Sequence, residues 1–354
     1  MKIGILSMQR VKNYGSFLQA FALRKTVESY NHDCEFIDIE LGRQLKEYRR
    51  STVLYLKKAR ERLFTRNIFH QVRNQYLFRK KFDSYLDMLD VSKNDFTSYD
   101  LAIIGSDEVF NVAQYTSWGF TTQLFGDISN TRRVISYAGS FGNTTLEIIY
   151  KYKLQEKISL ALKKLSIISV RDNNSRNIVK KLLDMDPVIN VDPVLFYDFN
   201  KYIKSIEDKN YILIYTYPGR MNDKNEVYSI KQIAKKLNKK LISIGFFFDW
   251  CDKTVIPEPF QVLSYFINAD FIITDTFHGS ILSVKYNKKF AVFIRNSNSN
   301  KLIFLLNSLG LTDRIVYDSS KIDSVLFQHV NYEYTNKVID IEIKKSRAFF
   351  QDNL

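Results

Sequence analysis

The chain has 354 residues, of which 45% are hydrophobic and 14% aromatic, and its formal charge is +14. This length exceeds the roughly 250–300 residues at which a single core stops growing, so we expect two domains. Five prolines and twelve glycines argue against a disordered or linker-rich chain. Two distant cysteines, no signal-peptide pattern and no apolar run of about eighteen residues predict a reduced, cytoplasmic protein that does not span a membrane.

The positive charge is concentrated in one segment. Between Arg43 and Lys81 there are thirteen Lys or Arg residues and only two Glu residues. Apolar and aromatic residues recur among them at helical spacing, which predicts basic amphipathic helices. Such helices can lie on an anionic membrane, bind nucleic acid phosphates, or form a solvated hairpin whose apolar stripe packs on the domain.

The first half of the chain alternates strand and helix patterns. Strands are predicted at 2–7, 34–39, 100–107, 134–138 and 167–170, and helices at 17–30 and 146–164. The segment 188–195 closes this half. Such alternation predicts βαβ units and a parallel sheet.

The second half repeats the pattern. Strands are predicted at 211–217, 240–245, 271–273 and 290–294, and helices at 226–237, 260–269, 281–286, 302–309 and 338–350. We therefore predict a first domain over 1–200 with a basic helical insertion at about 43–96, and a second over 201–335. A C-terminal helix over 336–354 can pack back across the domains.

Polar residues gather where the predicted strands end. Glycines there allow sharp turns, and the hydroxyls and cations suit an anionic, oxygen-rich ligand. The residues are Gly15, Gly105, Gly139, Gly142, Gly279, Ser16, Ser106, Ser140, Thr276, Arg171 and His278. His278 is suited to proton exchange near neutral pH; alternatively, it caps a helix or fills a polar pocket.

Several common sites are disfavoured. There is no phosphate-binding Gly-rich loop of the nucleoside triphosphate kind, no Gly-x-Gly-x-x-Gly, no Ser/His/Asp signature and no His/Cys/carboxylate cluster. We expect no metal and no cofactor.

Six segments, at 13–23, 105–111, 136–142, 169–172, 192–193 and 274–279, resemble in order the motifs of the polysaccharide pyruvyl transferases. The resemblance spans about residues 3–315. It implies an α/β protein of two Rossmann-like domains facing across a cleft, as in the glycosyltransferase-B fold. Members move pyruvate from phosphoenolpyruvate onto two sugar hydroxyls as a ketal, in capsular, exopolysaccharide or cell-wall glycans, and release phosphate.

The resemblance also implies roles for residues. His278 matches the family's histidine and is the predicted acid, and Arg171 is predicted to clamp a carboxylate or phosphate, unless it forms a salt bridge with Asp172 or Asp192. The other predicted donor-binding residues are Asn13, Tyr14, Gly15, Ser16, Gln19, Ser106, Asp107, Ser140, Thr276, Gly279, Ser280 and Lys301. Backbone amides near Gly15–Ser16 and Gly279–Ser280 are predicted to hold the phosphate.

The sequence departs from the family at one position. Many members carry an arginine two residues before the histidine, whereas Thr276 stands here. Phosphate binding is then expected to rely on Arg171 and on a later cation, which is Lys301, Arg295 or Arg314. Asp107 and Glu108 are candidates for the base, or cap the next helix. The aromatic run at 246–250 borders the acceptor site or belongs to the core.

The expected partners are phosphoenolpyruvate and a glycan or lipid-linked oligosaccharide acceptor. If the acceptor is lipid-linked, residues 43–81 would hold the enzyme at the inner face of the cytoplasmic membrane. Two other functions compete: a sugar-nucleotide-dependent glycosyltransferase of the same fold, and a nucleic-acid-binding protein. The strand-end motifs favour the pyruvyl transferase, so no nucleic acid is expected.

Overall fold

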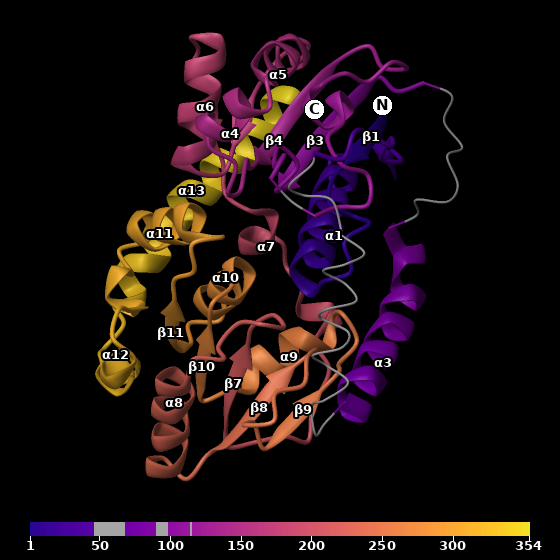
Figure 1. Cartoon of the computed structure of the whole chain (residues 1–354). Helices are drawn as coiled ribbons and strands as arrows, with labels where there is room; N and C mark the ends of the chain where they lie inside the picture. The colour runs from indigo at the N-terminus through magenta and orange to yellow at the C-terminus, as the bar shows by residue number, and fades with distance from the viewer. Residues whose placement is uncertain (46–67, 90–97, 114) are drawn as a thin grey trace. The chain divides into compact units, whose positions relative to one another are not determined.

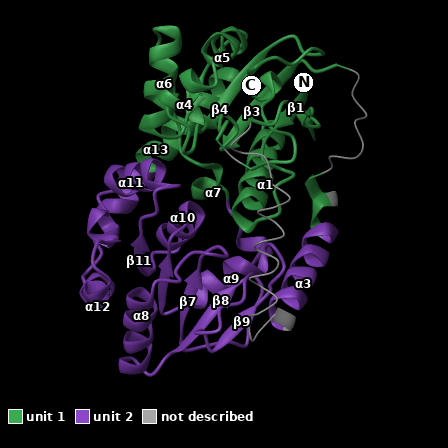
Figure 2. Cartoon of the chain, viewed as in Figure 1, with its two compact units in different colours: residues 1–59, 85–197, 340–354 green, residues 60–84, 198–339 purple. Residues whose placement is uncertain are grey.

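The computed structural model describes residues 1–45, 68–89, 98–113 and 115–354. The chain forms two compact units (Figure 2). Unit 1 consists of Met1–Ala59, Tyr85–Tyr197 and Asp340–Leu354, and unit 2 of Arg60–Ser84 and Asp198–Ile339. Residues 60–84, which lie in the predicted insertion of the first domain, belong to unit 2, and residues 340–354 of the predicted C-terminal helix belong to unit 1.

Unit 1 is built on a parallel sheet. In the described residues it has six strands in the order β2-β1-β3-β4-β5-β6. They are β1 (Lys2–Leu6), β2 (Asp33–Phe36), β3 (Leu101–Asp107), β4 (Val134–Gly139), β5 (Ser169–Val170) and β6 (Val188–Ile189). β3 and β4 are buried along their whole length, because helices cover both faces of a parallel sheet. This burial explains why they appear in the sequence as continuous apolar runs.

The helices of unit 1 begin at recognisable caps. They are α1 (Tyr14–Glu28), α4 (Leu146–Lys151), α5 (Gln155–Leu162), α6 (Asn173–Leu183) and α7 (Pro193–Phe196). Asn13, Thr145, Asp172 and Asp192 each accept a backbone hydrogen bond at the start of a helix. The single helix predicted over 146–164 is wrong, because Lys153 has a φ of 53° and separates α4 from α5.

The last helix, α13 (Tyr332–Asn353), contributes its final residues to the core of unit 1. Phe350 is fully buried, with its ring 4.4 Å from that of Tyr137 on β4. Arg133 donates to the backbone carbonyl of Asn353 at 3.2 Å and to its side-chain oxygen at 2.7 Å. These contacts make the C-terminus a structural part of the first unit.

Unit 2 is built on a second parallel sheet, with the strand order β12-β11-β10-β7-β8-β9 in the described residues. The strands are β7 (Tyr211–Tyr215), β8 (Lys240–Ile244), β9 (Lys253–Val255), β10 (Phe271–Thr274), β11 (Lys289–Phe293) and β12 (Ile315–Val316). The chain reverses direction across the sheet between β7 and β10, and in unit 1 between β1 and β3. Such switch points are where ligands bind in open α/β sheets, outside the carboxyl ends of the strands.

The helices of unit 2 are α8 (Lys224–Lys236), α9 (Gln261–Asn268), α10 (Phe277–Lys285), α11 (Ser299–Ser308) and α12 (Ile322–Phe327) (Figure 1). The helix α10 starts earlier than the predicted 281, because Thr276 caps it. Short 3₁₀ segments lie at Asp87–Leu89, Thr122–Phe125, Asn200–Tyr202, Thr312–Arg314 and Ser319–Lys321.

The helix α3 (Ile68–Leu86) contains the described part of the basic insertion. The Phe78 ring lies 5.2 Å from that of Phe246, and the His70 ring stacks on Phe247 at 5.6 Å. Lys81 donates to the carbonyl of Ile256 at 2.5 Å. Most of this helix thus packs on unit 2, which is why it leaves the predicted first domain. Residues 46–67 of the predicted basic segment lie outside the described residues.

Among the helices described, none combines the length and hydrophobicity that a membrane-spanning segment requires.

Candidate functional site

At the switch point of unit 1, three buried polar side chains bond to one another. Gln19 on α1 is fully buried and donates to the hydroxyl of Ser7, directly after β1, at 2.9 Å. Its side-chain oxygen accepts from Ser106 on β3 at 2.5 Å. Two predicted donor-binding residues, Gln19 and Ser106, are therefore brought together. Their hydrogen bonds join α1 to β1 and β3 inside the protein.

Arg171 lies at the centre of a buried ion-pair group. Its side chain is 2% exposed, and it donates to Asp192 at 2.7 Å and to Asp107 at 3.1 Å. The other oxygen of Asp107 accepts from Ser16 at 2.8 Å. Burial disfavours the charge, but the nearby carboxylates, first Asp107 and then Asp192, outweigh it and raise the pKa of Arg171. The salt bridge foreseen with Asp192 is present.

Ser140 and Asp172 form the next part of this group. The Ser140 hydroxyl donates to Asp172, and the other oxygen of Asp172 accepts from the backbone and hydroxyl of Ser175, both at 2.8 Å. Asp172 thereby caps α6. The predicted donor-binding Ser140 thus serves, in this structure, to hold a helix start.

The backbone at this edge of unit 1 is strained. Asp107 and Ala138 have φ angles of 72° and 46°, in the left-handed region that non-glycine residues rarely adopt. Asp107 is the last residue of β3 and Ala138 the last but one of β4, and Asp107 pairs with Gly139. Such conformations cost about 1–3 kcal/mol each and gather at functional sites. This edge therefore remains a candidate for binding.

The start of α1 holds three further predicted residues. Asn13 caps the helix by accepting from the backbone amide of Ser16 at 2.7 Å, and Tyr14 and Gly15 form the buried first turn. Because the Ser16 amide is used in this cap, the structure argues against its predicted role as a phosphate-binding amide.

In unit 2, His278 lies in the first turn of α10, directly beyond the end of β10. It is 6% exposed, and its ring meets that of Phe277 edge to face at 5.5 Å. Thr276 caps the helix through the amide of Gly279 at 2.9 Å, and the amide of Ser280 donates to the Thr276 carbonyl at 3.1 Å. These amides too are used within the protein, contrary to the predicted phosphate-binding role.

Gly279 is required by packing. A Cβ atom there would lie 2.2 Å from the hydroxyl of Thr274 and 2.6 Å from that of Thr276. No real Cβ atom is found so close to its neighbours. The glycine therefore allows α10 to start tightly against the end of β10, which fixes the position of His278.

Asp275 connects the end of β10 to its neighbours. This fully buried carboxylate accepts from Thr216 after β7 at 2.7 Å and from Arg295 after β11 at 3.1 Å. Its backbone carbonyl accepts from Asn298 at 2.6 Å. Burial raises the pKa of Asp275, against the Thr216 hydrogen bond and the charges of Arg220 and Arg295. Sequence reasoning missed this role, although Asp275 belongs to a segment it singled out.

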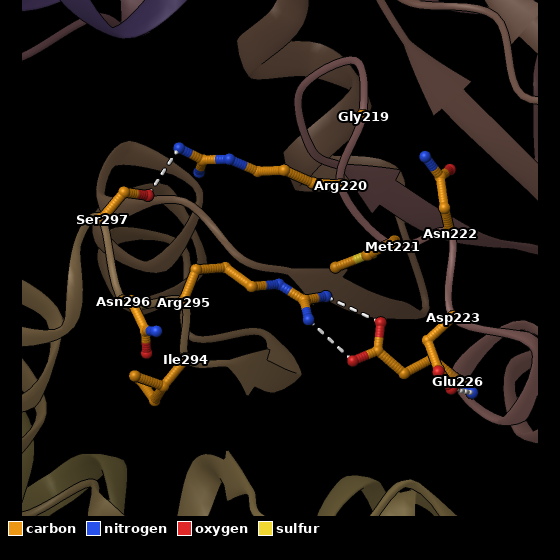
Figure 3. Close-up of a pocket in the computed structure, with 10 residues that line it drawn as sticks. All are labelled: Gly219, Arg220, Met221, Asn222, Asp223, Glu226, Ile294, Arg295, Asn296 and Ser297. Carbon is orange, nitrogen blue, oxygen red and sulfur yellow. Dashed lines mark hydrogen bonds and ion pairs between the residues drawn. The ribbon is translucent and has the colours of Figure 1, made fainter. Parts of the chain in front are cut away.

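Next to Asp275 lies a pocket of about 600 Å³ (Figure 3). The loops 219–223 and 294–297 line it, together with Glu226 on α8. Arg295 donates through two nitrogens to Glu226, at 2.7 and 2.8 Å, and Arg220 donates to Ser297 at 3.1 Å. None of the predicted catalytic or donor-binding residues lines it, and only Arg295 had been named, as a candidate cation.

The other candidate cations lie elsewhere in unit 2. Lys301 on α11 has its ammonium 5.6 Å from the Phe277 ring, so it lies near the start of α10. Arg314 is fully buried and donates to Asp313 at 2.8 Å and to the carbonyl of Gln328 at 3.2 Å. Of these two residues, Lys301 is the one near His278.

A grouping of three or more His, Cys, Asp or Glu side chains suited to a metal ion is not found within the described ranges.

Comparison with known proteins gives one family match. The model of the family described as polysaccharide pyruvyl transferase matches residues 13–298. The curated proteins include no match to the chain.

Several solved structures match nearly the whole chain, among them an epimerase and a rhamnosyltransferase. The UDP-GlcNAc 2-epimerase from Neisseria meningitidis bound to UDP-GlcNAc is 11% identical, with 99% of each chain covered and a TM-score of 0.50. The spinosyn rhamnosyltransferase SpnG is also 11% identical, with 99% of each chain covered and a TM-score of 0.49. At this identity the first likeness shows the fold alone. With the two parallel sheets, it confirms the predicted pair of Rossmann-like units of the glycosyltransferase-B kind; the cleft between them stays a prediction.

Proposed function

The chain belongs to the polysaccharide pyruvyl transferase family and is a transferase, and on this premise we propose that it moves pyruvate from phosphoenolpyruvate onto two hydroxyls of one sugar. The observation that supports this most is the family match over residues 13–298, which includes both Arg171 and His278. The acceptor is a polysaccharide or its precursor. No cofactor is required, because phosphoenolpyruvate carries the activated group.

The reaction needs an acid. A proton added to the methylene carbon of phosphoenolpyruvate makes the neighbouring carbon electrophilic, and a sugar hydroxyl then bonds to that carbon. A second hydroxyl displaces phosphate to close the ketal. The two hydroxyl protons are released, one restoring the acid and the other leaving with phosphate. General acid catalysis of this kind contributes about 10²–10⁴-fold.

His278 is the proposed acid. It lies in the first turn of α10, where Gly279 and Thr276 fix the backbone, and Lys301 lies against the neighbouring Phe277 ring. A cation there favours binding of the anionic donor. Arg171 is instead proposed to act as a positioning residue, because its guanidinium already donates to Asp107 and Asp192.

The donor is tested by calorimetric titration of the full chain with phosphoenolpyruvate, UDP-GlcNAc and a short RNA. Saturable binding of phosphoenolpyruvate supports the proposal. Binding of UDP-GlcNAc alone would establish the competing glycosyltransferase function, and salt-sensitive binding of RNA alone would favour nucleic acid.

The acid is tested by phosphate release from phosphoenolpyruvate with a panel of p-nitrophenyl glycosides. We expect His278→Ala to lower the rate by about 10²–10⁴-fold while donor binding remains. His329→Ala is the control, because His329 is exposed on the same unit. A rate for His278→Ala close to that of the control would rule out the acid role.

We also propose contact with anionic lipid at the inner face of the cytoplasmic membrane. On α3, Val72 and Tyr76 are 59% and 63% exposed, and Arg73, Arg79 and Lys80 are exposed beside them. Each cation near such a surface contributes about 1 kcal/mol. In a flotation assay, the fraction of protein bound to phosphatidylglycerol vesicles should fall in the Arg73→Glu/Lys80→Glu variant and at high salt. Equal binding to phosphatidylcholine vesicles would contradict this contact.

A further inference from the structure

The pocket in unit 2 occupies a position where a substrate is expected. Its two loops follow β7 and β11, which lie on either side of β10 in the sheet. Asp275 follows β10 directly, and His278 lies in the first turn of α10 just beyond it. Arg220 and Asn298, from the flanking loops, both donate to the Asp275 carbonyl, at 3.5 and 2.6 Å. The pocket is thus built directly against the segment that carries the proposed acid.

The charges around the pocket balance. Two arginines, Arg220 and Arg295, face two carboxylates, Asp223 and Glu226. All three donor positions used by Arg295 point at carboxylates: two at Glu226 and one at Asp275. The positive charge of Arg295 is therefore already offset by two carboxylates, and a multiply charged phosphoenolpyruvate would meet nearby negative charge.

The start of α8 does not offer an anion site either. Asp223 caps this helix by accepting from the backbone amides of Asn225 and Glu226, at 2.9 and 3.1 Å. Its carboxylate already satisfies these amides and offsets the positive end of the helix dipole. The charge pattern therefore favours a neutral, polar ligand.

The remaining groups suit sugar hydroxyls. Asn222, Asn296 and Ser297 each offer both a donor and an acceptor, and the partly exposed Ile294 adds apolar surface. A pocket of about 600 Å³ lies within the size range of small-molecule sites. Hydroxyls that both donate and accept, on a ring with an apolar face, match this lining.

Arg220 is held ready to donate. Its guanidinium lies 5.3 Å from the Tyr217 ring and donates to Ser297 at 3.1 Å, while 28% of the side chain remains exposed. In Figure 3 it extends along the edge of the pocket toward Ser297. A guanidinium has five N–H groups, so donors remain for a ligand hydroxyl.

We infer that this pocket binds a neutral pyranose ring of the acceptor glycan. The inference rests on the proposed transfer reaction and adds to it the place and the chemical class of the acceptor: an uncharged sugar held by the loops 219–223 and 294–297.

Saturation-transfer NMR with the full chain tests this inference, using the methyl β-pyranosides of glucose, galactose and mannose. We expect transfer to at least one of them, and at least tenfold weaker binding in the Asn222→Ala/Asn296→Ala variant. Asn307→Ala is the matched control, because Asn307 is exposed on α11, away from the pocket lining. Calorimetry with phosphoenolpyruvate on the same proteins should give unchanged binding.

Each result of these two measurements either supports or overturns the inference. Loss of phosphoenolpyruvate binding in the double variant, with glycoside binding kept, would make the pocket an anion site and overturn the inference. So would the absence of transfer to every glycoside, an effect no larger than that of the control, or displacement of the glycoside by UDP. If glycosides bind in the pocket but phosphoenolpyruvate does not bind at all, the donor assignment fails and the sugar site stands.

Discussion

In both units polar residues lie at the carboxyl ends of the strands. In unit 1 they bond within the protein, whereas in unit 2 some of them line a pocket. At the switch point of unit 1, Gln19, Ser106 and Arg171 are 0–4% exposed and bond to one another or to neighbouring carboxylates. At the switch point of unit 2, a pocket of about 600 Å³ remains open, and Arg220 keeps 28% of its side chain exposed. The polar side chains at the first place bond within the protein, whereas a pocket lies open at the second.

The difference shows that a polar residue at a strand end is not by itself a ligand-binding residue. In unit 1, such residues mostly join the sheet to α1 and α6. In unit 2, Asp275 likewise joins neighbouring strand ends through buried hydrogen bonds, and the residues of the two loops beside it line the open pocket. Stability should therefore respond most to changes in unit 1, and binding to changes in unit 2.

The chain provides a reporter for each unit. It has two tryptophans, Trp118 in unit 1 and Trp250 in unit 2. With selective excitation at the red edge of the absorption band, Trp250→Phe leaves tryptophan fluorescence from unit 1 alone, and Trp118→Phe leaves it from unit 2 alone. Urea unfolding in these two backgrounds assigns each stability change to a unit.

The largest expected effect follows from Arg171→Met. Removing this guanidinium leaves Asp107 and Asp192 buried without their cation, which should lower the stability of unit 1 by about 3–5 kcal/mol. Arg176→Met is the control, because Arg176 forms an exposed pair with Asp186. If Arg171→Met unfolds at the same urea concentration as the control, the buried ion pairs of Arg171 do not stabilise unit 1.

A smaller contrast is expected between two glycines. A Cβ atom at Gly105 would lie 2.0 Å from the Tyr137 carbonyl, with φ at +136°, so Gly105→Ala should destabilise unit 1 by about 2–3 kcal/mol. Gly219 has φ at +82° but nothing within 4 Å of such an atom, so Gly219→Ala should destabilise unit 2 by about 1 kcal/mol. If urea unfolding shows that both variants lose the same free energy of unfolding, the predicted difference between a packed and an open strand end is wrong.

A dependence of stability on pH is also expected in unit 2. Burial lowers the pKa of Lys285, at the far end of α10, to about 8, against the opposing charge of Asp198. The unfolded chain then holds this proton more tightly than the folded one, so the stability of unit 2 should rise as pH increases from about 8 to 10.5. Lys285→Met should remove this rise, whereas Lys231→Met, at an exposed position of α8, should keep it. A rise that persists in Lys285→Met would assign the proton to another group.

Much of the fold could be predicted from local pattern. Buried parallel strands such as β3 and β10 are short apolar runs that end in polar residues, and this signal needs no knowledge of distant contacts. The helix α6 was missed because its sequence, residues 173–183, is mostly polar and buries few apolar side chains. The early start of α10 was missed because its cap, Thr276, was assigned to a loop.

The candidate site was predictable only in part. His278 and Arg171 belong to segments with a recognisable pattern, and the structure places both at strand ends. The pocket in unit 2 gave no such signal, because Arg220, Glu226 and Arg295 come from separate parts of the chain that only the folded sheet brings together. The Arg171 pairs with Asp107 and Asp192 likewise join distant segments: Asp192 was one of the two partners that the sequence suggested, and Asp107 was not among them.

The contacts of α13 also set an order for biosynthesis. Unit 1 begins at the first residue, yet Phe350 fills its core against Tyr137, and Arg133 bonds to Asn353. During translation, residues 198–339 of unit 2 leave the ribosome before residues 340–354, so unit 2 can finish folding while unit 1 still lacks these core residues. The unit that starts first is completed last, and a nascent chain stalled before residue 340 would expose the apolar face of β4 to chaperones and proteases.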